Sequence, residues 1–182
     1  ALLYGKEEIL KKLPNQNHEF LDKLYPYTIN PGGPNHEELV SLIGIYEYID
    51  EIYKYHFDDA ENNIRNKIIA INKLISNHEQ LIANPVLKYI SESKNLNLIG
   101  KNKIVNNNRA PTISFTHKKL TSLELSNNLI KNKIATRNDN FYAWRCLKSL
   151  NIDTDDGVVR LSMTHYNNNE DSEKLINALK KI

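Results

Sequence analysis

The fold is decided by the stretch Gly157-Val158-Val159-Arg160-Leu161-Ser162-Met163-Thr164-His165. Apolar and polar side chains alternate along it, which is the pattern of a β-strand with one buried face. The buried face is predicted to carry Val159 and Leu161, whereas Arg160 shares the other face with two hydroxyl side chains. The polar run 168–171 follows and is suited to capping a last helix. The sequence therefore predicts a strand and a helix at the end of a mixed domain.

The segments before this strand predict the rest of the sheet. β-branched and aromatic residues indicate strands at 96–99 and 112–117, with a shorter strand at 134–137. Residues 121–124 form a capping box that opens a helix, and 141–150 is also expected to be helical. This order indicates a small, mainly antiparallel sheet of three or four strands covered by helices, which is an α+β arrangement.

The earlier part of the chain has mostly helical patterns. A short helix at 6–13 precedes an irregular segment rich in proline and glycine, 14–36. Residues 37–56 carry a wide apolar stripe, so we expect this helix to be buried against more than one neighbour. A second long helix is predicted to begin near Asp58-Asp59. We expect it to break at Asn84-Pro85, because proline lacks an amide donor and disfavours helix in the residue before it.

Charge and hydropathy exclude several classes of protein. The 182 residues contain 24 Lys and Arg against 22 Asp and Glu, a formal charge of +2, so the chain lacks the basic excess of a general nucleic-acid binder. The basic stretch 101–109 is interpreted as a solvated loop. Apolar runs are far shorter than the ~20 residues needed to cross a bilayer. With no recognisable signal peptide, we expect a cytoplasmic protein with no nucleic-acid or membrane partner.

Few side chains are candidates for chemistry on pattern alone. Arg160 is either a clamp for a carboxylate or an arginine on the solvent face of a half-exposed sheet. Gly32-Gly33 precedes a helix and could approach a phosphate, although an ordinary turn explains it too. The six histidines lack metal-binding spacing, so we expect no metal site. The single cysteine, Cys146, excludes an internal disulfide framework and is interpreted as an inert core thiol.

Several motifs together resemble the class V aminotransferases of the cysteine desulfurase type, most of all a branch labelled cysteine desulfurase-like. The motifs are the opening Ala1–Lys6, Asn17-His18, the run 31–37, the stretch 139–143 and the Arg-containing strand with its Tyr-Asn ending at 157–167. The resemblance implies pyridoxal phosphate (PLP), a fold type I homodimer with shared active sites, and an amino-acid substrate. It covers nearly all of the chain.

The resemblance also implies that this chain is the C-terminal half of the enzyme. Residues 1–94 would complete the large PLP-binding domain and its connecting helices, and 95–182 would form the small domain. We expect Ala1–Gly5 to be the end of a buried strand cut from a longer chain. The Schiff-base lysine would lie just before it, and Lys6, which follows it, does not match. The chain would then pair with the N-terminal half of the same protein and be inactive alone.

Individual site residues follow from the same resemblance. Arg160 matches the arginine that holds the substrate α-carboxylate. Arg137 and Asn140 match the active-site loop, in which 138–140 lacks the catalytic cysteine of the mainstream desulfurases. Gly32, Gly33 and Asn35 match the cofactor-binding loop. The choice among transamination, elimination, racemisation and desulfuration stays open, as does a non-catalytic role in dimerisation or partner binding.

Overall fold

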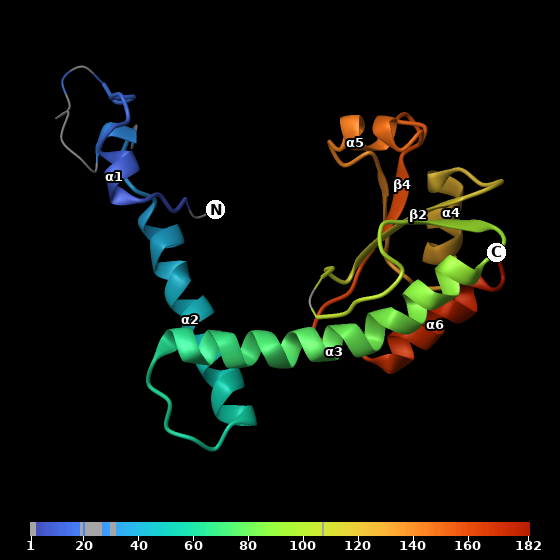
Figure 1. The fold of residues 1–182 in the computed structure, drawn as a ribbon, viewed down its shortest axis with the longest axis horizontal. Coiled ribbons are helices and arrows are strands. Elements are labelled where there is room, and N and C mark those ends of the chain that lie inside the picture. Colours follow the sequence, from blue (N-terminus) through green and yellow to red (C-terminus); the bar gives the residue numbers. More distant parts are fainter. Residues whose placement is uncertain (1–2, 19, 21–26, 30–31, 107) are drawn as a thin grey trace. The chain divides into compact units, whose positions relative to one another are not determined.

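The computed structural model describes residues 3–18, 20, 27–29, 32–106 and 108–182. The chain divides into two compact units, 1–60 and 61–182, which are described separately below (Figure 1). Of the segment predicted to be the end of a strand, Ala1 and Leu2 lie outside the described residues. Leu3 and Tyr4 are exposed and have no strand structure. The predicted division between domains at residue 94 stays a prediction.

The first unit is built around one long helix. A short helix, α1 (Glu7–Leu10), and a 3-10 turn, Tyr27–Ile29, precede α2 (His36–His56). Asn35 caps α2 by accepting the amide of Glu38 at 3.0 Å. Near the other end, the Tyr53 ring stacks on Phe57 at 4.6 Å and its hydroxyl donates to Asp59 at 2.6 Å. The predicted helix at 37–56 is confirmed.

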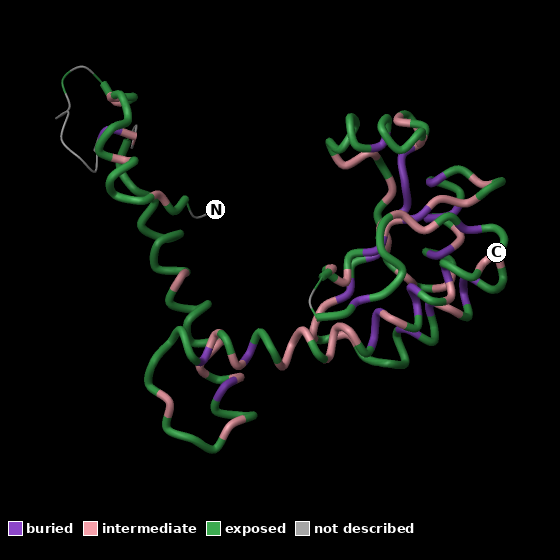
Figure 2. The backbone as a smooth tube through the Cα atoms, in the orientation of Figure 1, coloured by how far each residue is buried: buried purple, intermediate pink, exposed green. Residues whose placement is uncertain are grey.

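The apolar stripe of α2 is largely exposed within this chain. Leu39, Ile43 and Tyr46 are 51%, 55% and 48% exposed, and only Tyr53 among the helix residues is buried. Figure 2 shows α2 green along most of its length. The burial expected for this stripe is therefore not supplied by the residues that the structure describes.

The second unit opens with the longest helix, α3 (Ile64–Glu92). Its N-cap is Asn63, whose side chain accepts the amides of Arg65 and Asn66 at 2.9 and 3.4 Å. The start predicted near Asp58-Asp59 is therefore wrong, because Asp59 binds the Tyr53 hydroxyl instead. The cap actually used is an asparagine, which favours this position as strongly as aspartate does.

The predicted break at Asn84-Pro85 is also wrong, since α3 continues through Pro85. The side chains around the proline are completely buried: Ile82, Ala83, Val86, Leu87 and Ile90 are at most 1% exposed. Helices in proteins are held mainly by packing of an apolar face, so one missing amide bond does not end this one. Asn84 also stays in the helix and binds both the amide and the carbonyl of Ile104, at 2.8 and 3.2 Å.

A four-stranded antiparallel sheet follows α3, in the order β1-β2-β4-β3. The strands are β1 (Leu96–Ile99), β2 (Thr112–His117), β3 (Arg137–Asp139) and β4 (Val158–Ser162). The helices are α4 (Ser122–Lys131), α5 (Trp144–Ser149) and α6 (Asn169–Leu179). The predicted element order and α+β class are confirmed. The strand predicted at 134–137 is misplaced, because the pairing segment begins at Arg137, and α5 is shorter than predicted.

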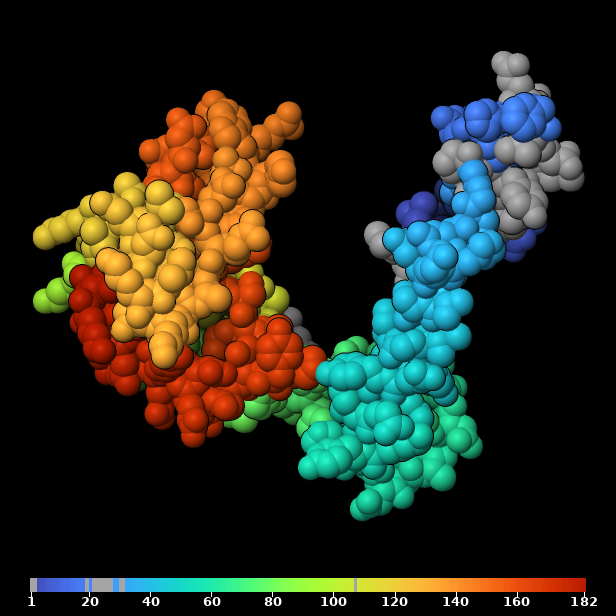
Figure 3. All heavy atoms as spheres, turned by 180° about the vertical axis from the view of Figure 1, so that it is seen from behind, coloured from blue at the N-terminus to red at the C-terminus, as the bar shows by residue number. Residues whose placement is uncertain are grey.

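One face of the sheet forms the core of this unit. Ile113, Phe115, Val159 and Leu161 point to it and are at most 4% exposed. Buried apolar residues from the C-terminal part of α3 and from α4 and α6 belong to the same cluster. Seen from behind, α4 (yellow) and α6 (red) lie side by side over the unit (Figure 3). The other face of the sheet is thereby left for polar side chains.

The turn between β4 and α6 is held by asparagines. Asn167 accepts the Thr164 amide at 2.9 Å and donates to Asp171 at 3.1 Å. Asn168 and Asp171 complete a reciprocal capping box at the start of α6. Asn167 of the Tyr-Asn motif thus links the strand to the helix cap. In the described part of the chain, no helix is long and apolar enough to span a membrane.

Candidate functional site

Arg160 lies in the middle of β4, on the face opposite the core. Its direct cross-strand neighbours are Ser114 on β2 and Arg137 on β3. Val159, the residue before Arg160, points to the opposite face, where its side chain is fully buried in the core. The alternating pattern of β4 therefore fixes the direction of the Arg160 side chain, as the sequence predicted.

The guanidinium of Arg160 is oriented but not neutralised. Its central carbon lies 4.1 Å from the centroid of the Phe141 ring, a cation–π arrangement. Its Nε is buried and has no hydrogen-bond partner among the described residues. No carboxylate of the described residues forms an ion pair with it. A buried guanidinium nitrogen without an acceptor costs free energy, and an anion that accepts from it removes that cost.

The loop that carries Phe141 has an unusual backbone. Phe141 and Tyr142 both have positive φ, 53° and 59°, a conformation that costs bulky residues free energy and occurs at functional sites. Asn140 holds the loop, because its side chain accepts the Tyr142 amide at 3.1 Å and donates to the Thr154 carbonyl at 3.2 Å. Asn140 is thus a positioning residue in this structure.

Gly157 allows the loop to approach β4. Its φ is +73°, and a Cβ there would meet the backbone of Asp139 and lie 2.7 Å from the Asn140 nitrogen. The amide of Gly157 donates to the Asp153 carbonyl at 2.9 Å. Only glycine permits both the conformation and the contact. Sequence reasoning missed Phe141 and Gly157 as site residues. The available signal was Asn140, which precedes two aromatic residues. Asparagine is a residue type that tolerates tight turns.

The predicted cofactor-binding residues lie in the first unit. Gly32 and Gly33 precede α2 and are exposed, and no neighbouring atom comes within 4 Å of where a side chain would begin. Such open backbone ahead of a helix fits a phosphate held by amide groups. Asn35 uses its side-chain oxygen to cap α2, which organises the same helix start. Pro31 of the predicted loop lies outside the described residues.

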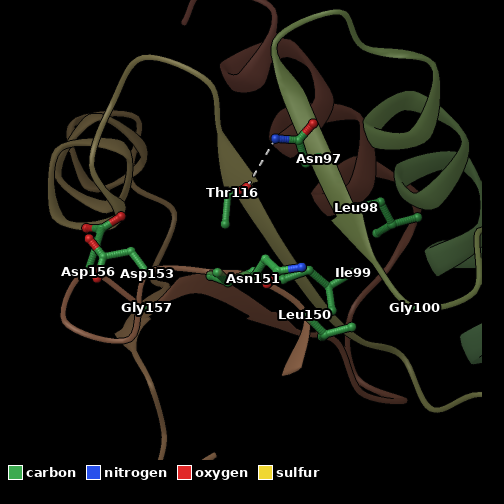
Figure 4. A pocket seen from close by; sticks show the side chains of 11 residues that line it. Asn97, Leu98, Ile99, Gly100, Thr116, Leu150, Asn151, Asp153, Asp156 and Gly157 are labelled. Carbon is green, nitrogen blue, oxygen red and sulfur yellow. Dashed lines mark hydrogen bonds between the residues drawn. The ribbon is translucent and has the colours of Figure 1, made fainter. Parts of the chain in front are cut away.

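A hollow lies on the open face of the sheet, between β1, β2 and the segment 150–157 (Figure 4). Its volume is about 520 Å³. Asn97 bridges to Thr116 at 3.3 Å inside it. Its two acidic side chains already accept backbone hydrogen bonds. Asp153 accepts the Asp155 amide at 2.9 Å within its own turn, and Asp156 accepts the Ser122 amide at the start of α4 at 2.8 Å. This hollow carries no group poised for chemistry.

Two further predictions concern Cys146 and the basic loop 101–109. Cys146 is exposed on α5, so its interpretation as a core thiol is wrong. Arg109 donates to the carbonyl of Lys101 and to that of Thr112, the latter at 3.2 Å, and so closes the basic loop upon itself. Among the described residues, no cluster of three or more His, Cys, Asp and Glu side chains could hold a metal.

Comparison with known sequences identifies a family. The model of the aminotransferase class-V family matches residues 67–175. An aminotransferase-like protein of Gibberella zeae, FGM3, is 26% identical over 183 aligned residues, which include all of this chain and 42% of the relative. The chain therefore spans less than half of the length of that relative.

Two cysteine desulfurases of known structure share the fold of this chain. The cysteine desulfurase CsdA of Escherichia coli superposes with a TM-score of 0.60 at 17% identity, covering 86% of this chain and 32% of that protein. A cysteine desulfurase of Thermococcus onnurineus superposes with a TM-score of 0.55 at 22% identity, covering 65% of this chain and 28% of that protein. At these identities the likeness concerns the fold.

Proposed function

The chain belongs to the aminotransferase class-V family, and on that premise we propose that it is the C-terminal portion of a PLP-dependent aminotransferase-like or cysteine desulfurase-like enzyme that acts on an amino acid. Members of the family use pyridoxal phosphate. The shares of its relatives that this chain covers, 42% and 32%, support a role as part of a longer enzyme.

The single observation that carries the proposal is the state of Arg160. It is half-buried, stacked on Phe141, and has a buried Nε without an acceptor. A substrate α-carboxylate would accept two parallel hydrogen bonds from such a guanidinium. Phe141 holds the plane of the guanidinium, and Asn140 holds the loop that presents Phe141. These residues would bind and orient the amino acid.

The remaining parts of the proposal concern the cofactor. PLP supplies an electron sink for bonds at the amino-acid α-carbon. Backbone amides at Gly32 and Gly33 would hold its phosphate, and Asn35 would keep the start of α2 in place. The lysine that binds the cofactor would come from a segment preceding Ala1, because Lys6 does not match it. The exposed apolar stripe of α2 supports assembly as a homodimer.

Replacing Arg160 in the complete, PLP-loaded protein tests this function. Arg160→Lys keeps the positive charge but loses the two parallel N–H donors of the guanidinium. Amino-acid binding should therefore weaken by about 1.5–3 kcal/mol, the range for hydrogen bonds to charged groups. Amino acid is titrated while the visible absorbance of the cofactor is followed. Arg145→Lys, an exposed position on α5, is the matched control and should bind as the wild type does. Equal affinities in all three proteins would make Arg160 an ordinary sheet residue.

A non-catalytic role in dimerisation is the second candidate, favoured by the exposed side chains of α2 and by the lack of a cysteine at 138–140. The same titration separates the two candidates. A protein that dimerises in light scattering, yet binds neither PLP nor amino acids, would support the second.

A further inference from the structure

Two arginines face each other across the open side of the sheet. Antiparallel pairing puts Arg137 of β3 directly opposite Arg160 of β4. Side chains of such a pair leave the same face of the sheet, with Cβ atoms roughly 4.5–5.5 Å apart. Like charges in this position repel, so an unliganded pair destabilises the sheet.

No acidic side chain of the described residues neutralises this pair. Neither Arg137 nor Arg160 forms an ion pair with a described residue. Asp139, two residues after Arg137, is the acidic residue of β3, and its carboxylate accepts the amide of Asn140 at 2.6 Å. Arg160 also retains its buried, unpartnered Nε. The pair thus has two positive charges and no internal counter-ion.

The two arginines differ in their surroundings. Arg160 is half-buried and fixed against Phe141, whereas Arg137 is exposed at the edge of the sheet. A fixed guanidinium suits a group common to all substrates, and a mobile, exposed one suits a group at the end of a short side chain. One ligand with two anionic groups would satisfy both.

We propose that Arg137 determines specificity, and that the substrate is an amino acid with an anionic side chain. This inference rests on the proposed function, in which Arg160 holds the α-carboxylate. Arg137 then binds a carboxylate on the side chain. Both contacts are charge-assisted, and each can be bidentate.

The test compares isosteric ligands on the complete, PLP-loaded protein. Aspartate and asparagine differ only in the charge that Arg137 would bind, so aspartate should bind at least ~10-fold more tightly, the effect of one charge-assisted contact. Absorbance of the cofactor reports amino-acid binding. Calorimetry with succinate, which has two carboxylates and no amine, reports the arginine pair independently of cofactor chemistry.

Substitution assigns the effect to one residue. In Arg137→Gln the ratio of asparagine to aspartate dissociation constants should fall to about one, and succinate binding should be lost. Arg145→Gln removes an exposed charge elsewhere and should preserve the ratio. Equal binding of the two amino acids to the wild type would overturn the inference. An equal loss of both in Arg137→Gln would also overturn it, since Arg137 would then share the α-carboxylate.

The outcomes separate this inference from the proposed function. If amino acids leave the cofactor spectrum unchanged while succinate binds through Arg137, the proposed function fails and the paired anion site stands. If succinate also fails to bind, the paired site is overturned.

Discussion

The two faces of the sheet differ in what completes them. On one face, Phe115 and Val159 are fully buried by side chains that this chain itself supplies from α3, α4 and α6. On the other, Ser114, Arg160 and Arg137 lie side by side with no internal counter-ion among the described residues. The first face is completed when the chain folds, whereas the second retains two positive charges and an unpartnered Arg160 Nε among the described residues. The same backbone register produces both, because neighbouring residues of a strand point to opposite faces.

The largest effect should come from the buried face. Phe115→Ala removes a completely buried ring and should lower the free energy of unfolding by about 3–5 kcal/mol, because the core collapses only partly around the cavity. Urea unfolding of the chain, followed by circular dichroism, measures the loss. Ser114→Ala, its neighbour on the open face, should change stability by no more than about 0.5 kcal/mol. Similar losses in both variants would contradict the difference between the faces.

A smaller loss is expected where the loop meets β4. Gly157→Ala places a side chain against the backbone of Asp139 in a left-handed conformation, which should cost about 1–3 kcal/mol of unfolding free energy. Amino-acid affinity of the complete protein should fall as well, since the loop presenting Phe141 must move. Gly33→Ala, in open surroundings, is the control for stability. A Gly157→Ala protein as stable as the wild type would show that the close approach is not required.

The aromatic support of Arg160 should have a still smaller effect, confined to binding. Phe141→Leu removes the ring 4.1 Å from the guanidinium and should weaken amino-acid binding about 2- to 30-fold, corresponding to about 0.5–2 kcal/mol for a cation–π contact. Tyr142→Leu is matched, because it removes the adjacent ring in the same backbone conformation. Equal effects of the two substitutions would mean that Phe141 does not orient Arg160.

Features with local causes could be predicted from the sequence. The alternation around Arg160 fixed which face it occupies, and the capping box at Thr121 and Glu124 opened α4 as expected. Features with distant causes could not. The passage of α3 through Pro85 depends on packing against the sheet, and the short strand β3 depends on pairing with β4 rather than on its own pattern.

The candidate site divides in the same way. Arg160 could be singled out from its strand, but the ring stacked on it could not, because Phe141 lies in a loop whose backbone has positive φ at Phe141 and Tyr142. The pairing of Arg137 with Arg160 is a property of register, which a sequence alone leaves open when a three-residue strand forms at an edge.

The smallest effect concerns the turn that joins β4 to α6. Hydrogen bonds from the Asn167 side chain and then from the Asn168 amide hold the pKa of Asp171 below its usual value. A lowered carboxyl pKa contributes stability above the unfolded-state pKa, about 3.9 for aspartate, and this contribution is lost as pH falls through the folded-state pKa. Asp171→Asn should therefore be less stable than the wild type at pH 7, and the two urea midpoints should converge on acidification below about pH 4.

Burial also lowers the pKa of His117, so both proteins lose stability below neutral pH, and that loss cancels in the comparison. Asp155→Asn is the control, because the Asp155 carboxylate makes no hydrogen bond among the described residues, and its midpoint should follow the wild type throughout. A constant difference between wild type and Asp171→Asn from pH 7 to pH 3 would mean that the charge of Asp171 does not stabilise the turn.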